Sequence, residues 1–356
     1  ISGLASCSDN SDDNYEEIPS YPFVEAEFGS TVDLGNLANY ANQTVPAYII
    51  KDNSQGNLIT DKGATLGRVL FYDKNLSSNN TISCASCHKQ EFAFSDTNVA
   101  STGVNGTTGR HSMRLINSRF ASETKFFWNE RALNLETQTT MPIKDHGEMG
   151  FSGENGDLSF DDLITKLSAI GYYKELFKFV YGTEEITEAK IQSALAQFIR
   201  SIQSFDSKYD AGRALATNDG QPFSNFTAQE NQGKNLFLSP PVFNTNGVRT
   251  SGGLGCAGCH RAPEFDIDPN TLNNGIIGTI AGTGIDTGNT RAPSLRDLVR
   301  TDGTTNGPMM HTGVITTLQA AIGHHGTINL APGNNNLDPR LTPGGVGQQL
   351  NLTATE

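Results

Sequence analysis

The sequence predicts a mainly α-helical protein with two domains in tandem and long ordered loops. Its 356 residues fit about two domains. Apolar residues recur at helical spacing in several segments, whereas the alternation typical of strands is scarce. A short pattern also occurs twice, as Gly67–Phe71 (GRVLF) and Gly233–Phe237 (GKNLF), which favours a duplicated unit. The 37 glycines and 14 prolines account for the expected loops.

The helices expected up to the second copy of the pattern follow from spacing and capping residues. Each copy of the pattern is typical of the end of a short helix, and the second helix starts with a capping box at Thr227 and Glu230. Another helix is expected to start at Ser159, and a longer amphipathic one follows Thr187. Their expected apolar faces are Leu163, Leu167 and Ile170 in the first, and Ile191, Leu195, Phe198, Ile202 and Phe205 in the second.

The C-terminal part is expected to hold one short helix and much loop. A capping pattern at Thr316 and Gln319 predicts a helix that runs to His324 and His325. Residues 330–347, rich in Pro, Gly and Asn, predict loop, and residues 352–356 are typical of the start of a further helix.

Two Cys-x-x-Cys-His runs carry the chemistry of this chain. In such a run the two thiols form thioethers to the haem vinyl groups, and the adjacent histidine coordinates the iron. A split zinc site or disulfides would also use paired cysteines, but neither requires the histidine that follows both pairs. The runs therefore predict two covalent c-type haems, bound by Cys84, Cys87 and His88 and by Cys256, Cys259 and His260.

The charge of the chain limits its partners. A formal net charge of −13 excludes nucleic acid as a binding partner, because a phosphate backbone requires a concentrated positive surface. A soluble redox protein with a basic face fits this charge better.

The fifth cysteine, Cys7, points to a membrane anchor. It follows Leu4-Ala5-Ser6, which resembles a bacterial lipobox, and precedes a polar run. The alternative is an unpaired exposed thiol. No other stretch is apolar enough for a membrane span. We expect residues 1–22 to be a lipoprotein signal remnant and flexible acidic tether, which would hold the protein in the periplasm or at the cell surface.

Several motifs in order resemble the bacterial di-haem cytochrome c peroxidase family, including its methylamine-utilisation branch. Beyond the haem motifs they are residues 66–73, 127–132, 142–150, 292–296 and 310–313, within a resemblance that covers roughly residues 60 to 356. The resemblance implies an N-terminal peroxidatic haem domain over residues 23–205. It also implies a C-terminal domain over residues 206–356, where electrons enter, with the haems facing the domain interface.

The resemblance also assigns roles to individual residues. Glu148 matches the family's acid/base residue, which moves a proton between the two oxygens of peroxide. Gln138 and Pro142 match positions of the pocket around it. Trp128, the only tryptophan, matches an aromatic bridge for electron transfer between the haems, although most tryptophans are core residues.

At the first haem the sequence departs from the family pattern. Many members carry a histidine that caps the peroxidatic iron at rest, and that position falls at about Gly103 here. His111 and Met113 lie in the same loop as alternative iron ligands. His111 also stands where the family places an asparagine ligand of calcium, which leaves the backbone carbonyls of Asn306 and Pro308 for that ion.

At the second haem the family's sixth ligand, a methionine or tyrosine, is replaced. His325 occupies that position, so we expect it to complete the coordination of the iron opposite His260. His324 is the alternative ligand, and a histidine without a metal is the other alternative. A bis-histidine haem has a lower reduction potential than a histidine/methionine haem.

The function expected from the resemblance is reduction of hydrogen peroxide to water. Electrons would come from a small c-type cytochrome or a cupredoxin. One alternative is an oxidase of the methylamine-pathway type that acts on a protein or organic substrate. Another is a non-catalytic di-haem electron-transfer protein, and a homodimer stays an open alternative.

Overall fold

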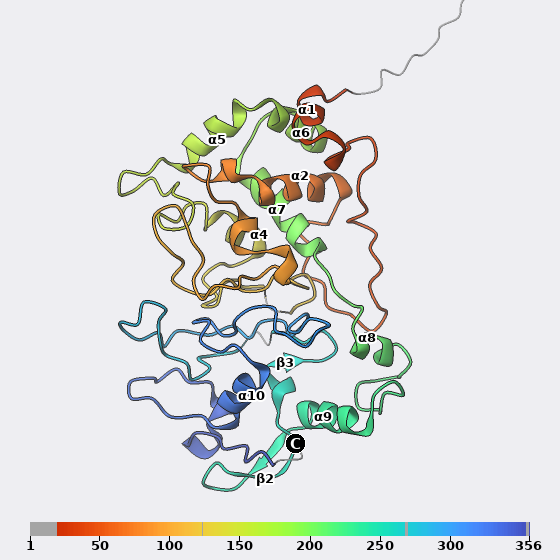
Figure 1. Cartoon of the computed structure of the whole chain (residues 1–356), viewed down its shortest axis with the longest axis vertical. Coiled ribbons are helices and arrows are strands. Elements are labelled where there is room, and N and C mark those ends of the chain that lie inside the picture. Colours follow the sequence, from red (N-terminus) through yellow and green to blue (C-terminus); the bar gives the residue numbers. More distant parts are fainter. Residues whose placement is uncertain (1–19, 123, 268–269, 354–355) are drawn as a thin grey trace, which may run out of the picture.

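The computed structural model describes residues 20–122, 124–267, 270–353 and 356. Figure 1 shows the labelled helices α1, α2 and α4 to α7 in one half of an elongated molecule and α8 to α10, with the labelled strands, in the other. The helices are α1 (Pro22–Phe28), α2 (Asp61–Tyr72), α3 (Cys84–Cys87), α4 (Leu135–Thr140), α5 (Phe160–Ser168), α6 (Gly171–Tyr181), α7 (Glu188–Ser201), α8 (Lys208–Arg213), α9 (Ala228–Leu238) and α10 (Leu318–Gly326). Helices are the main regular structure, as predicted.

Two short antiparallel sheets lie in the C-terminal half, and the sequence did not predict them. Strands β1 (Pro241–Phe243) and β2 (Arg249–Gly252) form one hairpin, and β3 (His260–Arg261) and β4 (Asp266–Ile267) form the other. Each strand has four residues or fewer. A period of two cannot be recognised over such lengths.

The core of the N-terminal half is the contact between α2 and α7. The two helices approach so closely that a Cβ atom on Gly67 would lie 2.0 Å from the carbonyl oxygen of Ala194. Leu66, Leu70 and Leu195 are fully buried around this contact. Glycine is therefore required on α2 because any larger side chain would force the helices apart.

The predicted helix starts are confirmed, with one correction. The side chains of Ser159, Thr187 and Thr227 each accept the N–H group three residues later, at the starts of α5, α7 and α9. The predicted cap at Thr316 is wrong by one residue, since Thr317 accepts the Ala320 N–H group and α10 follows it.

The predicted ends of α5 and α7 were too late, whereas the repeated pattern does lie at the ends of α2 and α9. Helix α5 ends at Ser168, so Ile170 lies outside it and precedes α6, a helix that the sequence did not predict. Helix α7 ends at Ser201, and Phe205 instead packs edge-on against Phe120 with ring centroids 4.9 Å apart. Tertiary contacts thus use an apolar residue that periodicity assigned to the helix.

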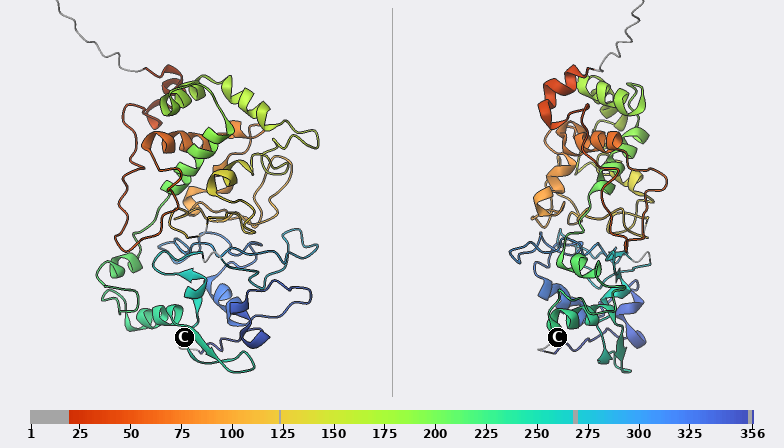
Figure 2. Two further views of the ribbon diagram at one scale, coloured as in Figure 1. Left: turned by 180° about the vertical axis from the view of Figure 1, so that it is seen from behind. Right: turned by 90° about the vertical axis from the view of Figure 1, so that its right-hand side faces the viewer.

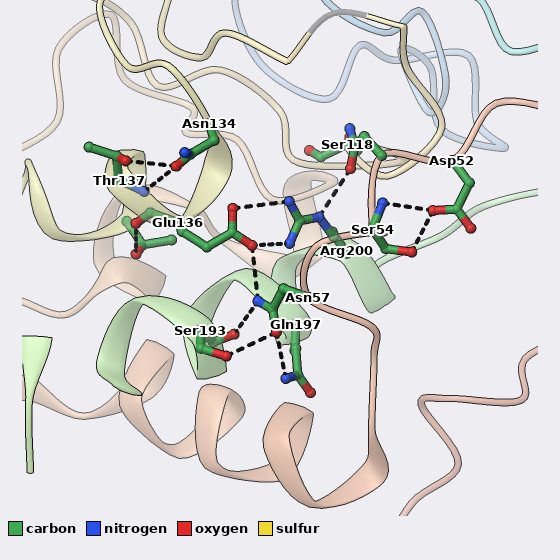
Figure 3. Close-up of polar contacts among 12 residues, drawn as sticks. Asp52, Ser54, Asn57, Ser118, Asn134, Glu136, Thr137, Ser193, Gln197 and Arg200 are labelled. Carbon is green, nitrogen blue, oxygen red and sulfur yellow. Dashed lines mark hydrogen bonds and ion pairs between the residues drawn. The ribbon is translucent and has the colours of Figure 1, made fainter. Parts of the chain in front are cut away.

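A polar cluster ties α4 to α7. Arg200 on α7 forms a two-pronged ion pair with Glu136 on α4 (Figure 3). The Nε of Arg200 also donates to Asn53 at 3.0 Å. Burial opposes ionisation of Glu136, but hydrogen bonds from Arg200 and Asn57 outweigh it and lower the pKa of that carboxyl. The cluster lines a cavity of about 460 Å³. It fixes the helix that carries Gln138.

The N-terminal segment links the two halves. The chain between α1 and α2 runs along one side of the molecule to α8, which the view from behind also shows (Figures 1 and 2). Near its turning point Tyr48 donates to Asp210 at 2.8 Å, and Lys51 pairs with Asp266 at 2.5 Å. Asp210 also forms a buried ion pair with Arg296 at 2.6 Å. The predicted boundary at residue 206 falls between α7 and α8, and the division into domains stays a prediction.

Some sequence predictions lie outside the described residues. Cys7 and most of the predicted tether belong to residues 1–19, which the structure does not describe. Helix α1 begins at Pro22 and buries Val24 against the N-terminal half. Within the described ranges, every helix is too short or too polar to cross a membrane.

The two copies of the repeated pattern give a matched pair of substitutions. Gly67→Ala should lower the free energy of unfolding by about 1–3 kcal/mol, because the new methyl group overpacks the contact between α2 and α7. Gly233→Ala, whose methyl group meets no atom within 4 Å, should raise it by about 0.5–1 kcal/mol through helix propensity. Urea unfolding followed by circular dichroism checks both. Equal effects of the two substitutions would contradict the close helix contact.

Candidate functional site

The first Cys-x-x-Cys-His run is a single helical turn that is capped at its start. In α3, the hydroxyl groups and backbone N–H groups of Ser83 and Ser86 satisfy one another. Cys84 and Cys87 stand three residues apart, so their side chains leave the same face of the turn. Neither of these cysteines forms a disulfide, and the same holds for Cys256 and Cys259. No group of three or more metal-binding side chains occurs in the described part of the chain.

The His88 ring is held in one orientation by a strained loop. Its Nδ1 lies 3.1 Å from the carbonyl oxygen of Phe94. To bring that carbonyl back under the ring, Ala93 and Phe94 adopt positive φ angles of 57° and 55°, which costs energy in residues other than glycine. Burial lowers the pKa of His88. A neutral ring with Nδ1 as donor leaves Nε2 as the free iron ligand.

The second run is built differently. Cys256 starts a 3₁₀ turn after Gly255, which has a positive φ of 72°. His260 then enters β3 opposite Ile267. Burial lowers the pKa of His260 to about 3, and the neighbouring His325 contributes. This ring too is therefore neutral, the form that binds iron.

The two histidines at the end of α10 make different contacts. His325 Nδ1 lies 3.0 Å from the carbonyl oxygen of Ala321 in its own helix, and His325 influences the pKa of His260. His324 Nε2 instead lies 2.9 Å from the carbonyl oxygen of Asn274. The bond to Ala321 is made by Nδ1, so Nε2 of His325 is the ring nitrogen that can serve as a ligand.

Glu148 lies near the first run, in a loop fastened by a carboxylate. The side chain of Asp145 accepts the N–H groups of Gly147 at 2.9 Å and Glu148 at 3.0 Å. Burial, and then the charge of Asp145, raise the pKa of Glu148 to about 7, against an opposing effect of Arg131. A carboxyl group with this pKa can both accept and donate a proton near neutral pH.

The other predicted pocket residues lead into the same loop. Gln138 lies in the last turn of α4, and its carbonyl accepts the Met141 N–H group at 3.2 Å. The carbonyl of Pro142 then accepts the Asp145 N–H group at 3.2 Å. Consecutive turns therefore connect Gln138, Pro142 and Glu148.

Trp128 joins the two halves of the molecule. Its Nε1 donates to the carbonyl of His111 at 2.7 Å, and its own carbonyl accepts the Arg291 N–H group at 2.7 Å. Its ring meets the ring of His311 edge-on at 6.3 Å. His111 in turn donates its N–H group to the carbonyl of His311 at 2.8 Å. The tryptophan is 7% exposed, so it is also a core residue.

His111 and Met113 do not offer obvious iron ligands. His111 Nδ1 lies 3.0 Å from the carbonyl of Asn98, and its Nε2 lies 3.3 Å from the Ser95 hydroxyl. The backbone of Met113 is hydrogen-bonded to the His88 ring.

The residues at the predicted calcium position fit that ion poorly. The Asn306 side chain already accepts from Arg300 at 2.9 Å and donates to the carbonyl of Asp297 at 2.9 Å. His111 supplies a hydrogen-bonded imidazole where a hard oxygen ligand is needed. Only the backbone carbonyls of Asn306 and Pro308 would remain, and calcium stays a prediction.

The sequence did not single out several residues that border the site. Ser101 affects the pKa of the Cys87 thiol, and Arg131 and Asp145 affect the pKa of Glu148. Arg131 belongs to the motif of residues 127–132 and stacks on Phe127 at 3.5 Å, so its place in the motif was a usable signal. Ser101 had none.

Comparison with known proteins places this chain in a family. A family model described as di-haem cytochrome c peroxidase matches residues 61–218. The chain is 30% identical to the methylamine utilization protein MauG of Methylorubrum extorquens over 282 residues, which cover 76% of this chain and 70% of that protein. It is 28% identical to the cytochrome c551 peroxidase of Nitrosomonas europaea, with coverage of 75% and 73%.

Solved structures agree with the sequence relatives. A MauG-like protein associated with microbial copper homeostasis superposes with a TM-score of 0.64 at 28% identity, over 88% of this chain and 92% of that one. The diheme peroxidase BthA from Burkholderia thailandensis has the same fold, with a TM-score of 0.56 at 20% identity over 80% and 75% of the two chains. The chain therefore belongs to the di-haem cytochrome c peroxidase family and is an oxidoreductase of the cytochrome c peroxidase type.

Proposed function

We propose that this protein is a periplasmic di-haem peroxidase that reduces hydrogen peroxide to water with electrons from a small soluble redox protein. The observation that carries the proposal is the half-buried Glu148, whose pKa of about 7 suits proton transfer, beside the first haem-binding run. When bound, the two haems supply the iron at which peroxide is reduced and the store for the second electron. A pure electron carrier would not need an acid/base residue in such a place.

The side chains divide the work of proton transfer and orientation. Ionised Glu148 accepts the proton of one peroxide oxygen and returns it to the other, so that water leaves rather than hydroxide. Two electrons and two protons convert one peroxide molecule into two waters. Gln138 and Pro142 shape the pocket around the carboxylate. Phe94 orients the His88 ring through its carbonyl.

Electron supply uses the other half of the chain. His260 and His325 would hold the second haem, and Trp128 would provide the aromatic connection between the halves. The net charge of −13 favours a donor with a basic face, such as a small c-type cytochrome or a cupredoxin.

The location follows from the sequence around Cys7. Attachment of c-type haem is typical of exported proteins, and acylation of Cys7 would tether the chain in the periplasm or at the cell surface. The proposal includes this anchor as the only contact with the membrane.

Glu148→Gln tests the proposed chemistry. The variant should keep both haems, seen as the mass of two covalent haems that the chain retains after denaturation. It should turn over peroxide about 10²- to 10⁴-fold more slowly with a reduced cytochrome as donor. In the wild type, the carboxylate that acts as base is the form present above a pKa of about 7. Turnover should therefore rise with pH through about 7, and this limb should be absent in the variant.

Two results would contradict the proposal. One is turnover of the Glu148→Gln variant within a few-fold of the wild type. The other is wild-type protein that reduces no peroxide but oxidises a protein or an organic amine, which would indicate a MauG-type oxidase.

The fully oxidised protein should bind cyanide at the first iron without prior reduction. The predicted capping position is Gly103, which has no ligand atom, and the ring of His111 is engaged in other hydrogen bonds. Stopped-flow mixing of oxidised protein with cyanide measures this. Binding that becomes fast only after one-electron reduction would show that another residue caps the iron.

His325→Ala should convert the second haem from low spin to high spin in electron paramagnetic resonance and raise its reduction potential, because an imidazole ligand is lost. The matched control is His324→Ala, whose ring is bonded to Asn274 and which should keep the low-spin signal. The reverse pattern would assign the ligand to His324.

A further inference from the structure

A short loop lies against the backbone of Glu148. Residues 101–108 fold back on themselves, with the Gly103 N–H group donating to Gly106 at 2.9 Å and the Thr108 N–H group donating to Ser101 at 2.9 Å. The tip of this loop contains Gly103, which stands at about the position of the capping histidine in the family that the sequence resembles.

Three hydrogen bonds fasten this tip to the segment that carries Glu148. The Val104 N–H group donates to the carbonyl of Glu148 at 3.0 Å, and the Asn105 N–H group donates to Gly147 at 3.2 Å. The side-chain amide of Asn105 adds a bond to the carbonyl of His146 at 3.0 Å. We name this contact between residues 103–105 and 146–148 the Glu148 clasp.

The clasp requires glycine at position 103 for reasons of space. A Cβ atom there would lie 2.1 Å from the carbonyl oxygen of Gly147 and 2.9 Å from the Cα of Glu148. Gly103 does not have a positive φ, so conformational freedom is not the reason. Any side chain at this position, a histidine included, would push the two segments apart.

The same loop also reaches the first haem-binding run. At its base the Ser101 hydroxyl donates to Asp96 at 2.6 Å. Asp96 is buried and paired with Lys89, the residue after His88, at 2.7 Å. One loop is thus attached at its base to the haem-binding run and at its tip to Glu148.

We propose that the Glu148 clasp sets the position of the Glu148 carboxyl group relative to the first haem, with Gly103 and Asn105 as positioning residues. The proposal rests on the proposed peroxidase function. In this view the loop that could have carried an iron cap holds the acid/base residue in place instead, in the oxidised and the reduced protein alike. Neither residue touches peroxide, and both act through the backbone of residues 146–148.

The test compares Gly103→Ala and Asn105→Ala with the matched control Gly109→Ala, whose methyl group meets no atom within 4 Å. A displacement of about 1 Å at the reacting group costs up to about 100-fold in rate. Gly103→Ala should therefore lower kcat for peroxide by about 10- to 100-fold and Asn105→Ala by about 3- to 10-fold, both with little change in KM. Gly109→Ala should stay within about two-fold of the wild type.

Hydrogen exchange gives a readout that does not depend on turnover. The amides of Val104 and Asn105 should lose protection in Gly103→Ala and keep it in Gly109→Ala, while α2 and α7 stay protected in both. If Gly103→Ala fails to fold, Asn105→Ala carries the same comparison, because Asn105 is exposed and its truncation creates no clash.

Combination with Glu148→Gln separates the possible failures. If the clasp acts through Glu148, Gly103→Ala should slow the Glu148→Gln variant by less than about two-fold. Two results would overturn the clasp proposal alone. One is equal slowing by Gly103→Ala in the wild-type protein and in the Glu148→Gln variant. The other is a wild-type kcat in both Gly103→Ala and Asn105→Ala although amide protection is lost. Wild-type turnover in Glu148→Gln itself would instead overturn the proposed function.

Discussion

The hydrogen bond between the His88 ring and the carbonyl of Phe94 is the interaction on which the first site depends. It holds the partly buried imidazole in one orientation and one tautomer, so that Nε2 is the nitrogen offered to iron. Two neighbouring residues, Ala93 and Phe94, accept a left-handed backbone to make it. The Lys89 N–H group donates to Ser95 at 2.8 Å and closes this loop. Strain of this kind persists only where surrounding contacts determine the backbone.

Polar contacts rather than apolar packing connect that loop to the acid/base residue. Asp96 is 1% exposed and receives hydrogen bonds from Lys89 and Ser101, which lie on either side of it in the sequence. Through Ser101 the same network leads to the loop that lies on Glu148. Nearby, the carboxylate of Asp145 accepts hydrogen bonds from two backbone N–H groups, while burial raises the pKa of Glu148. Two carboxyl groups three residues apart thus have different surroundings, since one binds backbone N–H groups and the other is largely removed from water.

The glycines show how much a local pattern leaves open. Gly67 and Gly233 occupy the same position in the two copies of the repeated pentapeptide, and both lie inside helices that end within five residues of them. Gly67 touches α7, whereas Gly233 faces open space. Gly103 carries no signal in its own sequence context, yet it stands against the backbone of Glu148. The requirement for glycine comes from a neighbour that is distant in the sequence.

The sequence by itself determined the features that depend on residues close together in the chain. Covalent haem attachment needs only the spacing within Cys84–His88 and Cys256–His260. The starts of α5, α7 and α9 follow from capping side chains three residues from the groups they bond. Tertiary structure decided the rest. It removed Phe205 from the apolar face of α7, turned His324 toward Asn274, and brought Gly103 against Gly147. These outcomes depend on which distant segment supplies the neighbouring carbonyl or ring, and local spacing does not specify that partner.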